Sequence, residues 1–139
     1  MLFRVVLDTN VLISALISEG KPRVLLRRIV LNEFVMVTSD LLIEEFENVI
    51  HRSKFRVNEE QISREIYALM QVAEVVDVVS KFDVVERDFK DNMVLETAYD
   101  GKAVFIVSGD DHLLTLKSFR GIKIVSVKEI LDYLEENQV

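Results

Sequence analysis

Four carboxylates stand where a carboxylate could take part in chemistry, and two of them follow apolar runs. Asp8 comes directly after LFRVVL, and Asp110 comes directly after AVFIVSG. Each run is typical of a buried strand, so both acids lie at the carboxyl end of a predicted strand, where the functional sites of open α/β sheets gather. Either acid can also be an ordinary helix cap: Asp8 or Asn10 for the first helix, and Ser108 or Asp110 for the helix around LLTL.

The third acid, Glu45, lies in the predicted helix SDLLIEEFENVI. A rotation of roughly 100° per residue puts Glu45 on the flank of the buried stripe, whereas Glu44 and Glu47 point away from it. A flanking Glu can simply extend to water, but Glu45 is the best placed of the three for an inward role. The buried stripe consists of Leu42, Phe46 and Val49.

The fourth acid, Asp91, is the most informative position in the chain. The apolar residues Val94, Leu95 and Ala98 follow it at i+3, i+4 and i+7. Asp91 therefore lies within the apolar stripe of its helix, on the first turn. A buried carboxylate needs a cation or hydrogen bonds. Helix-start N–H groups could supply these bonds, but Asp88 is the better N-cap candidate.

Together these patterns predict one acidic site, with two acids at strand ends and two on the inner faces of helices. Carboxylates brought together repel one another, and a divalent cation would resolve that conflict. The chain has no Cys and only two His, so oxygen ligands are expected, which favour Mg²⁺ or Mn²⁺ and suit phosphoryl chemistry. Asp111 is hard to separate from its neighbour Asp110, and His112 is interpreted as a surface helix residue rather than a ligand.

The strands that must position these acids are predicted from apolar runs. Most of the runs are nearly continuous rather than alternating, as in a parallel sheet covered on both faces. Four runs are predicted strands, and a fifth, VVDVV around Asp77, is a weaker candidate. The four runs are residues 2–7, 34–37, 103–107 and 122–125.

Helical periodicity lies between these runs. Strand and helix alternate, which predicts an α/β fold: a three-layer α/β/α sandwich with a central parallel sheet of four to five strands, in one domain over residues 1–139. The helix-start signals are Pro22 for residues 24–31, Ser39 for a helix through Ile50, and Ser126 with Glu129 as a capping box before the last helix.

Composition limits the class of protein. No apolar run approaches the ~20 residues of a membrane span, and no secretory signal is seen at the N-terminus, so the expected location is the cytoplasm. The formal net charge is −7, which by itself argues against a nucleic-acid partner. Acidic enzymes can nevertheless act on phosphodiesters when metal ions lie between carboxylates and phosphates.

The positive charge is concentrated in two windows that contain no acid. These windows could hold a polyanion on either side of the acidic site. The first follows the helix that starts after Asp8, and the second follows the helix that carries Glu45. The alternative is that they only solvate the surface. The first window, KPRVLLRR, contains Lys21, Arg23, Arg27 and Arg28, and the second, HRSKFR, contains Arg52, Lys54 and Arg56.

Four blocks in this order resemble a PIN domain, the PilT N-terminal type of metal-dependent ribonuclease. They are VVLDTNVLISAL, TSDLLIEEFENVI, DFKDNMVLETA and VFIVSGDDHLLTL, and the resemblance covers nearly the whole chain. The LDTNVLISAL opening is most similar to the bacterial and archaeal branch described as toxins of toxin–antitoxin pairs.

The resemblance implies roles for individual residues. It assigns Asp8, Glu45, Asp91 and Asp110 to the family's acidic quartet, which binds one or two Mg²⁺ or Mn²⁺ ions and activates water for hydrolysis of single-stranded RNA. Asn10 and Ser108 match supporting positions, and Asp111 is a candidate auxiliary ligand. The chain departs from the family pattern at Phe89, where Pro is frequent, and at His112, where Asp is frequent. An antitoxin partner and a homodimer are further expectations.

Other readings of the acids fit less well. A haloacid dehalogenase-type phosphotransferase needs a second Asp two residues after Asp8, where this chain has Asn10. A response-regulator receiver needs an acid pair after the first strand and a late Lys. The stronger alternative is a catalytically inactive PIN-like scaffold that binds RNA or protein. The intact quartet argues against it, and loss of metal-dependent cleavage on changing Asp91 would separate the two.

Overall fold

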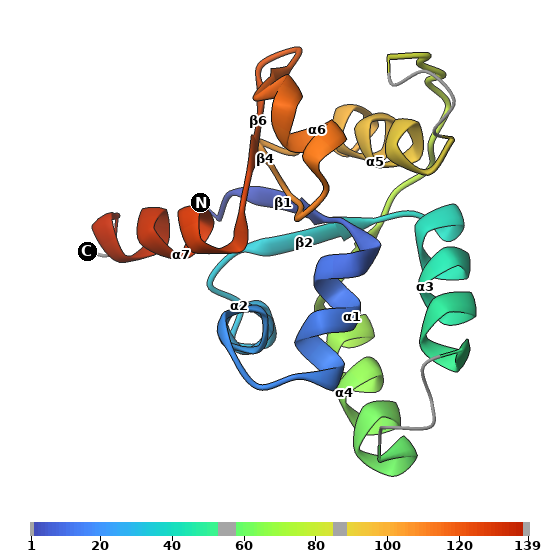
Figure 1. Ribbon diagram of the computed structural model, residues 1–139, viewed down its shortest axis with the longest axis vertical. Helices are drawn as coiled ribbons and strands as arrows, with labels where there is room; N and C mark the ends of the chain where they lie inside the picture. Colours follow the sequence, from blue (N-terminus) through green and yellow to red (C-terminus); the bar gives the residue numbers. More distant parts are fainter. Residues whose placement is uncertain (1, 53–57, 85–88, 138–139) are drawn as a thin grey trace.

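A computed structural model describes residues 2–52, 58–84 and 89–137, and Figure 1 shows their arrangement. The described strands form a six-stranded sheet in the order β3-β2-β1-β4-β6-β5. All neighbours in it are parallel except β5 and β6. In chain order the elements are β1 (Arg4–Leu7), α1 (Thr9–Ile17), α2 (Lys21–Val30), β2 (Val35–Thr38), α3 (Asp40–Arg52), α4 (Glu59–Val72), β3 (Glu74–Val75), α5 (Phe89–Asp100), β4 (Phe105–Val107), α6 (Asp111–Leu116), β5 (Ser118–Phe119), β6 (Ile122–Val125) and α7 (Val127–Glu136).

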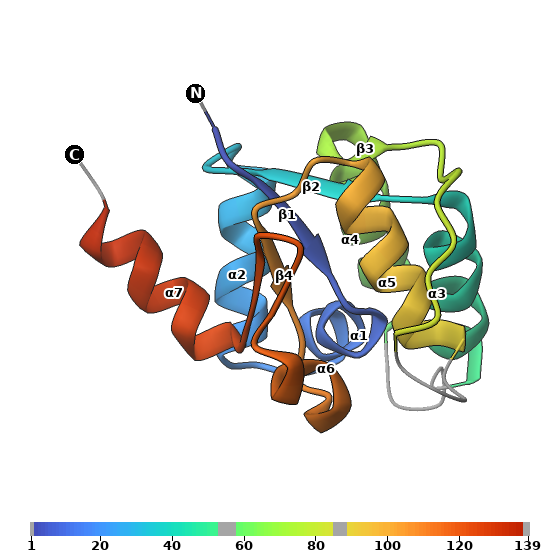
Figure 2. The same cartoon turned by 90° about the horizontal axis from the view of Figure 1, so that it is seen from above.

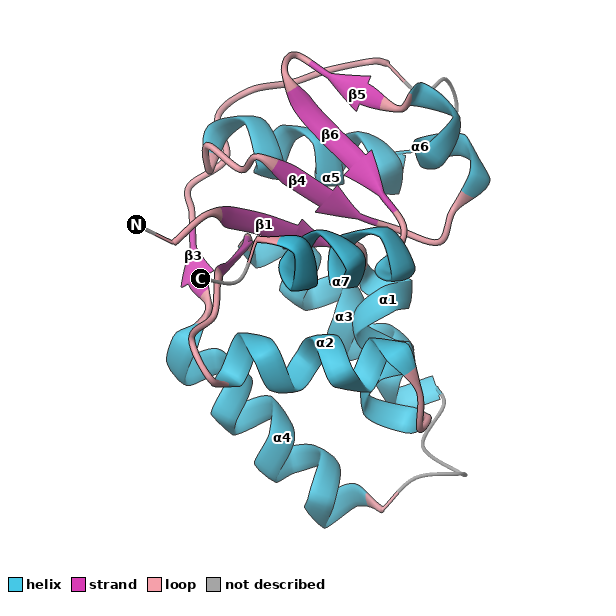
Figure 3. Ribbon diagram, turned by 90° about the vertical axis from the view of Figure 1, so that its left-hand side faces the viewer, coloured by secondary structure: helices cyan, strands magenta, loops and turns pink. Residues whose placement is uncertain are grey.

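The sheet separates two apolar cores, which confirms the predicted three-layer α/β/α fold. Successive side chains of a strand point to opposite faces, and β1 shows this directly: Val5 and Leu7 belong to one core and Val6 to the other. Helices α1, α2 and α7 pack on the first face, and α5 and α6 on the second (Figure 3). Strands buried on both faces explain why the apolar runs are nearly continuous.

The fifth predicted strand is shorter than expected. Only Glu74 and Val75 pair with β2, although the N–H of Val76 still donates to the carbonyl of Thr38 at 2.9 Å. Beyond that point the chain leaves the sheet, because other groups accept its N–H donors. The apolar pattern of VVDVV indicates extended backbone correctly, but it does not identify the partner of that backbone.

Residues 79–84, called the strap below, run along α5 instead of along a strand (Figure 2). Three polar side chains spaced four residues apart on α5 accept the N–H groups of the strap. Four residues of helix rise by about 6 Å, close to two residues of extended chain, so the two repeats match. The contacts are Val79 and Ser80 to Asp100 Oδ2 (2.7 and 2.8 Å), Phe82 to Glu96 Oε2 (2.9 Å) and Val84 to Asn92 Oδ1 (3.1 Å).

The β5–β6 hairpin at the sheet edge was not predicted from the sequence. Its turn residues Arg120 and Gly121 have φ angles of 50° and 84°. A two-residue hairpin turn with both φ angles positive is usually announced by Asn-Gly or Asp-Gly. Arg at the first position hides the signal. The Arg120 guanidinium lies 4.7 Å from the ring centroid of Phe82, which fastens the hairpin to the strap.

The helix starts largely follow the predictions. Pro22 occupies the first turn of α2, and Ser126 with Glu129 forms both bonds of the capping box of α7. Ser39 precedes α3 as expected, but its hydroxyl lies 2.9 Å from Thr97 Oγ1 and so links α3 to α5. In the part of the chain that the structure describes, no helix is both long enough and apolar enough to cross a membrane.

Candidate active site

Two site residues lie where β1 and β4 end at the same edge of the sheet. Leu7 pairs in register with Val107, so the residues that follow them, Asp8 and Ser108, are neighbours. The N–H of Asp8 donates to the Val107 carbonyl at 2.9 Å, and Ser108 Oγ donates to Asp8 Oδ2 at 2.8 Å. The N–H of Ser108 donates to the carbonyl of Val125 at 3.0 Å. Three strand ends therefore hold this pair in place.

The backbone of Asp8 starts α1, but its side chain is not a helix cap. The Asp8 carbonyl accepts the N–H groups of Val11 and Leu12, whereas within the described residues the carboxylate makes no capping hydrogen bond. The residue is 8% exposed. Asp8 is thus the N-cap residue of α1 by its backbone only. Its buried carboxylate lies at the sheet edge and does not cap the helix.

The electrostatics of Asp8 show that other acids lie close to it. Burial raises the pKa of Asp8 above its ordinary value, and the negative charges of Asp110 and Glu45 raise it further. The hydroxyl of Ser108 and the N–H of Thr9 act in the opposite direction. Two of the other predicted acids therefore act on Asp8, although all three are far apart in the sequence.

Asp110 is both a helix cap and a member of this group. Its Oδ1 accepts the N–H of His112 at 2.7 Å, so it caps α6 as one interpretation predicted. Its own N–H donates to Ser108 Oγ at 3.0 Å. Ser108 therefore joins Asp8 and Asp110 through one hydroxyl. Because Ser108 is completely buried, these two hydrogen bonds also satisfy a hydroxyl that water cannot reach. A plain Ala could not make either contact.

Asp91 lies on the first turn of α5 and is 5% exposed, as its position in the apolar stripe predicted. One ligand atom each of Asp91, Asp110 and His112 lies within 4.8 Å of the others, an arrangement that could hold a metal ion. His112 is a surface residue, as expected, but its Nδ1 is 3.5 Å from Asp110 Oδ1. The surface position of His112 agrees with the expectation, and its exclusion as a ligand stays a prediction.

A sequence signal for His112 did exist. It stands two residues after Asp110, the position where the resembling family often has Asp. The turn into α6 brings the side chain at this position back over its own cap. The path of the backbone into α6, rather than the type of residue at position 112, therefore places this side chain beside Asp110.

Glu45 reaches the site from α3. Its side chain is 16% exposed, and Lys90 Nζ lies 3.1 Å from Glu45 Oε1. Glu44 and Glu47 are exposed, as the helical spacing predicted. Lys90 was not among the predicted residues. It lies on the first turn of α5 beside Asp91 in the sequence, so its contact ties α3 to the start of α5.

Asn10 and Asp111 lie at the mouth of the site. Both are exposed, and both line an open hollow together with Gly109, Asp110 and His112. The hollow also extends to Pro22 at the start of α2. This placement is consistent with the auxiliary role expected for the two residues, and it puts the start of α2 at the rim.

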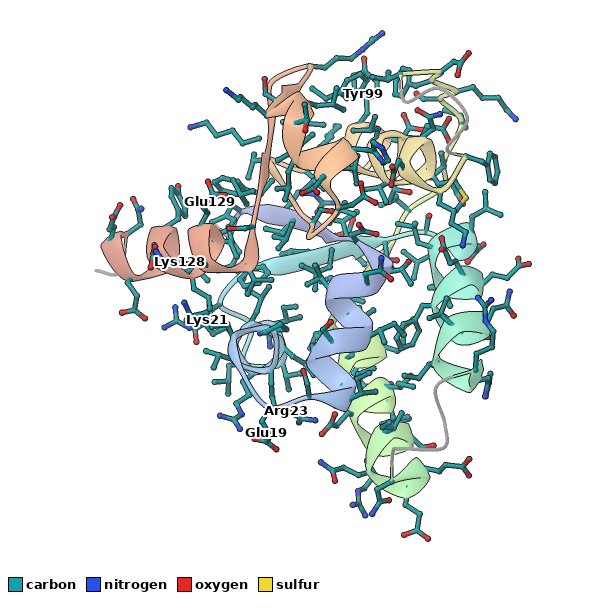
Figure 4. All side chains as sticks on the ribbon, in the orientation of Figure 1. Glu19, Lys21, Arg23, Tyr99, Lys128 and Glu129 are labelled. Atoms are coloured by element: carbon teal, nitrogen blue, oxygen red, sulfur yellow. The ribbon has the colours of Figure 1, made fainter. Side chains whose placement is uncertain are left out.

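The first basic window divides along its helix. Figure 2 shows α2 beginning on the side where β1 ends and running back toward the side where β2 begins. Lys21, at the start of α2, is exposed (Figure 4). Arg23 is bound by Glu65 at 2.8 Å. Arg28 pairs with Glu33 and Glu135.

These ion pairs change the expectation for the window. Arg23 also donates to the carbonyl of Leu16, so it serves to hold α1, α2 and α4 together. Arg28 serves similarly between α2 and α7. In the second window, Arg52 is exposed and donates to the carbonyl of Asn48. Lys54 and Arg56 lie outside the described residues.

Comparison with known proteins identifies the class. The model of the PIN domain family matches residues 4–112, a range that contains all four acids. The chain therefore belongs to the PIN domain family, which confirms the resemblance seen in the sequence. Membership points to a nuclease in general, in agreement with an acidic cluster at the end of the sheet.

Two individual proteins are similar over nearly the full length. The uncharacterized protein MJ1680 of Methanocaldococcus jannaschii is 31% identical over 145 residues, which cover 96% of this chain and 92% of that protein. The crystal structure of PAE2754 from Pyrobaculum aerophilum matches with a TM-score of 0.68 at 20% identity, over 98% of this chain and 91% of that one. At this identity the second match shows the fold alone.

Proposed function

We propose that this protein is a divalent-metal-dependent ribonuclease that hydrolyses phosphodiester bonds in single-stranded RNA. The main support is the meeting of four acids from four separate blocks of the sequence. Asp8 is electrostatically coupled to Asp110 and Glu45, and Asp110 lies beside Asp91. Repulsion of this kind opposes folding, so its retention points to a positively charged ligand.

The donor set fits a divalent cation. Asp91, Asp110 and His112 would hold one ion, and Asp8 and Glu45 add negative charge to the same site. Carboxylate oxygens favour Mg²⁺ or Mn²⁺. Such an ion, when bound, makes a coordinated water more acidic and stabilises negative charge on the departing oxygen.

The protein's own groups keep the acids in position. Ser108 donates its hydroxyl to the Asp8 carboxylate and accepts the backbone N–H of Asp110, so the Asp8 carboxylate and the Asp110 backbone are fixed before any ligand arrives. Asp110 is held a second time by the N–H of His112. The carboxylates also repel a free phosphate, so an RNA backbone can approach only where a cation offsets their charge.

The test is cleavage of a fluorescent single-stranded RNA, measured with Mg²⁺, with Mn²⁺ and with excess EDTA. We expect cleavage with either ion, none with EDTA, and none from Asp110→Asn. Asp77→Asn, a change of an exposed acid outside the site, is the matched control and should cleave normally. Cleavage that persists in EDTA would refute the proposal.

One observation favours the alternative of an inactive scaffold. The ammonium group of Lys90 already lies against Glu45 and could replace a metal as counter-charge. The Lys90 side chain is 63% exposed, so it can move away at little cost. If the RNA is bound but never cut with any divalent ion, the scaffold function is the correct one.

Backbone binding is assigned to the exposed cations of the two windows. Lys21 lies near the rim of the site, whereas Arg27 and Arg52 lie farther along their helices. Each phosphate contact removed should lower the salt-dependence slope of RNA binding by about 0.7. Lys21→Glu should therefore flatten the slope, and Arg28→Glu, which breaks internal ion pairs, should lower stability instead.

We extend the proposal to a toxin role in the cytoplasm, with an antitoxin protein as partner and a homodimer as the working form. Exposed apolar side chains on α2 and just after its end support a protein interface, with Val24 40% and Leu31 70% exposed. Sedimentation at micromolar concentration tests the dimer, and growth arrest on expression tests the toxin. A monomer, or unimpaired growth with an active enzyme, would contradict the respective part.

A further inference from the structure

An open groove of 540 Å³ lies next to the acidic site but outside it. Its walls come from the start of α3, the strap and the first turns of α5. This volume is within the range of about 300–1,000 Å³ that small-molecule sites occupy. The lining residues used below are Leu41, Lys81, Phe82, Asp83, Phe89 and Glu96.

The groove and the acidic site share one face of α3. Leu41 stands one helical turn before Glu45, so both lie on the same face of α3. Phe89 stands at the start of α5, two residues before Asp91, so its side chain points away from the buried Asp91. An RNA strand bound at the acids therefore reaches the groove along the face of α3 that Leu41 and Glu45 share.

The groove presents apolar surface that folding leaves uncovered. The Phe89 ring is 71% exposed and Leu41 is 48% exposed. Phe82 behaves differently, because its ring packs edge-on against Tyr99 and Phe119 with centroids 5.3 and 5.1 Å away. Phe82 thus belongs to the structure of the strap, and Phe89 is the aromatic ring that remains for a ligand.

Charge selects the kind of ligand. Glu96 is fixed in the groove by the N–H of Phe82 at 2.9 Å, and Asp83 lines it as well. These carboxylates repel a phosphate within the groove but not a neutral base. Lys81 is exposed and lines the groove too, and can hold a phosphate at its rim. The groove therefore fits a base, with its phosphate outside.

We propose that this groove binds one unpaired nucleobase of the RNA, stacked on Phe89, next to the nucleotide at the acidic site. The inference rests on the proposed ribonuclease function and adds a subsite to it. Base–aromatic stacking tolerates any base, because every base offers a π-face. The groove would therefore favour single-stranded over paired RNA without specifying sequence.

The experiment is a double-mutant cycle that combines two changes: substitution of Phe89 in the protein and removal of one base from the RNA. Binding is measured by fluorescence anisotropy in an Asp91→Asn background, so that the RNA is not cut. Short single-stranded RNAs carry one abasic site, moved stepwise along the strand. Each is titrated against proteins with Phe89, Phe89→Ala or Phe89→Tyr, and against Tyr67→Ala, which removes an equally exposed ring from α4.

Phe89→Ala should weaken binding of intact RNA about 5- to 150-fold, which corresponds to roughly 1–3 kcal/mol of stacking. Phe89→Tyr should bind normally, and so should Tyr67→Ala. One abasic position should weaken binding to the parent protein by a similar factor and have no further effect on Phe89→Ala. That loss of additivity is the signature of a base stacked on this ring.

Two results would overturn the inference, and they are distinguishable. If the wild-type protein cleaves RNA but the abasic and Phe89→Ala losses add at every position, the groove does not hold a base, whereas the ribonuclease function stands. If the wild-type protein neither binds nor cleaves RNA, both proposals fail. Quenching of 2-aminopurine placed at the sensitive position, measured on the wild-type protein, provides a check that needs no substitution at Phe89.

Discussion

Two aspartates of this protein have similar neighbours but opposite electrostatics. Asp8, at the sheet edge, accepts a hydroxyl hydrogen bond from Ser108 at 2.8 Å. Asp100, at the end of α5, accepts one from Ser80 at 2.6 Å. Burial, the largest effect, raises the pKa of Asp8, whereas at Asp100 the effect of burial is outweighed by hydrogen bonds that lower its pKa.

The difference lies in what else surrounds each carboxylate. Asp100 also accepts the N–H groups of Val79 and Ser80. These hydrogen bonds stabilise its charge and hold the strap against α5. Asp8 instead faces the charges of Asp110 and Glu45. In the folded protein, hydrogen bonds stabilise the charge of Asp100, whereas other carboxylates repel the charge of Asp8. A carboxylate in the second situation is the kind expected at a ligand site.

The largest expected contrast is in activity. Asp91→Asn should lower the rate of RNA cleavage by about 10²–10³-fold, the loss typical of removing one group that stabilises charge in the transition state. Its melting temperature in EDTA should stay the same or rise, because repulsion with Asp110 disappears. Asp100→Asn is the control and should retain the cleavage rate per folded molecule. An Asp91→Asn protein that fails to fold would instead make Asp91 a structural partner.

Metal binding should stabilise the protein when the acidic site is intact and fail to do so when Asp110 is changed. At a concentration about 100 times its Kd, Mg²⁺ or Mn²⁺ should raise the free energy of unfolding by about 2.7 kcal/mol. Thermal melts should show this gain in the wild type and in Asp100→Asn, and should lose it in Asp110→Asn. An equal gain in Asp110→Asn would place the ion elsewhere.

Removing the hydrogen bonds between Asp100 and the strap should lower the free energy of unfolding by an amount similar to, or smaller than, the gain from metal binding. Asp100→Ala leaves the N–H groups of Val79 and Ser80 without their acceptor, so it should cost about 1–3 kcal/mol in urea unfolding. Asp8→Asn should have the opposite sign in metal-free buffer, since it removes a repelled charge and keeps the shape. If both substitutions destabilise the protein, the proposed contrast between the two carboxylates is wrong.

The smallest effect is in the pH dependence of stability, measured in EDTA by urea unfolding. The lowered pKa of Asp100 means that its contribution is present above the ordinary value of 3.8 and is lost as the pH falls through the folded-state pKa. The raised pKa of Asp8 has the reverse sign: stability falls as the pH rises from 3.8 through the folded-state pKa. Asp100→Asn should remove the first slope and Asp8→Asn the second.

Much of the site could be predicted because its parts are local patterns. The offsets from Asp91 to Val94, Leu95 and Ala98 gave its burial, and all four positions are buried. The run before Asp8 predicted a strand end, and the capping box of α7 was predicted from Ser126 and Glu129. Each of these signals lies within a few residues of chain, where backbone geometry alone fixes the relation between neighbours.

The parts that could not be predicted are contacts between residues far apart in the chain. Ser108 meets Asp8 across 100 positions of sequence, and Arg28 meets Glu135 across 107. A basic window looks the same in the sequence whether its cations face RNA or are bound by acids from other helices. Only the packing of those helices decides which cations remain exposed.

The sequence by itself determined the class of fold and singled out the candidate acids, because periodicity and strand-end position are encoded locally. The tertiary structure decided how those acids are used. It made Ser108 a bridge, brought His112 over Asp110, set Lys90 against Glu45, and ended the fifth predicted strand at Val75. Charges act through space rather than along the chain, so their balance at the sheet edge exists only once the strands and helices have packed.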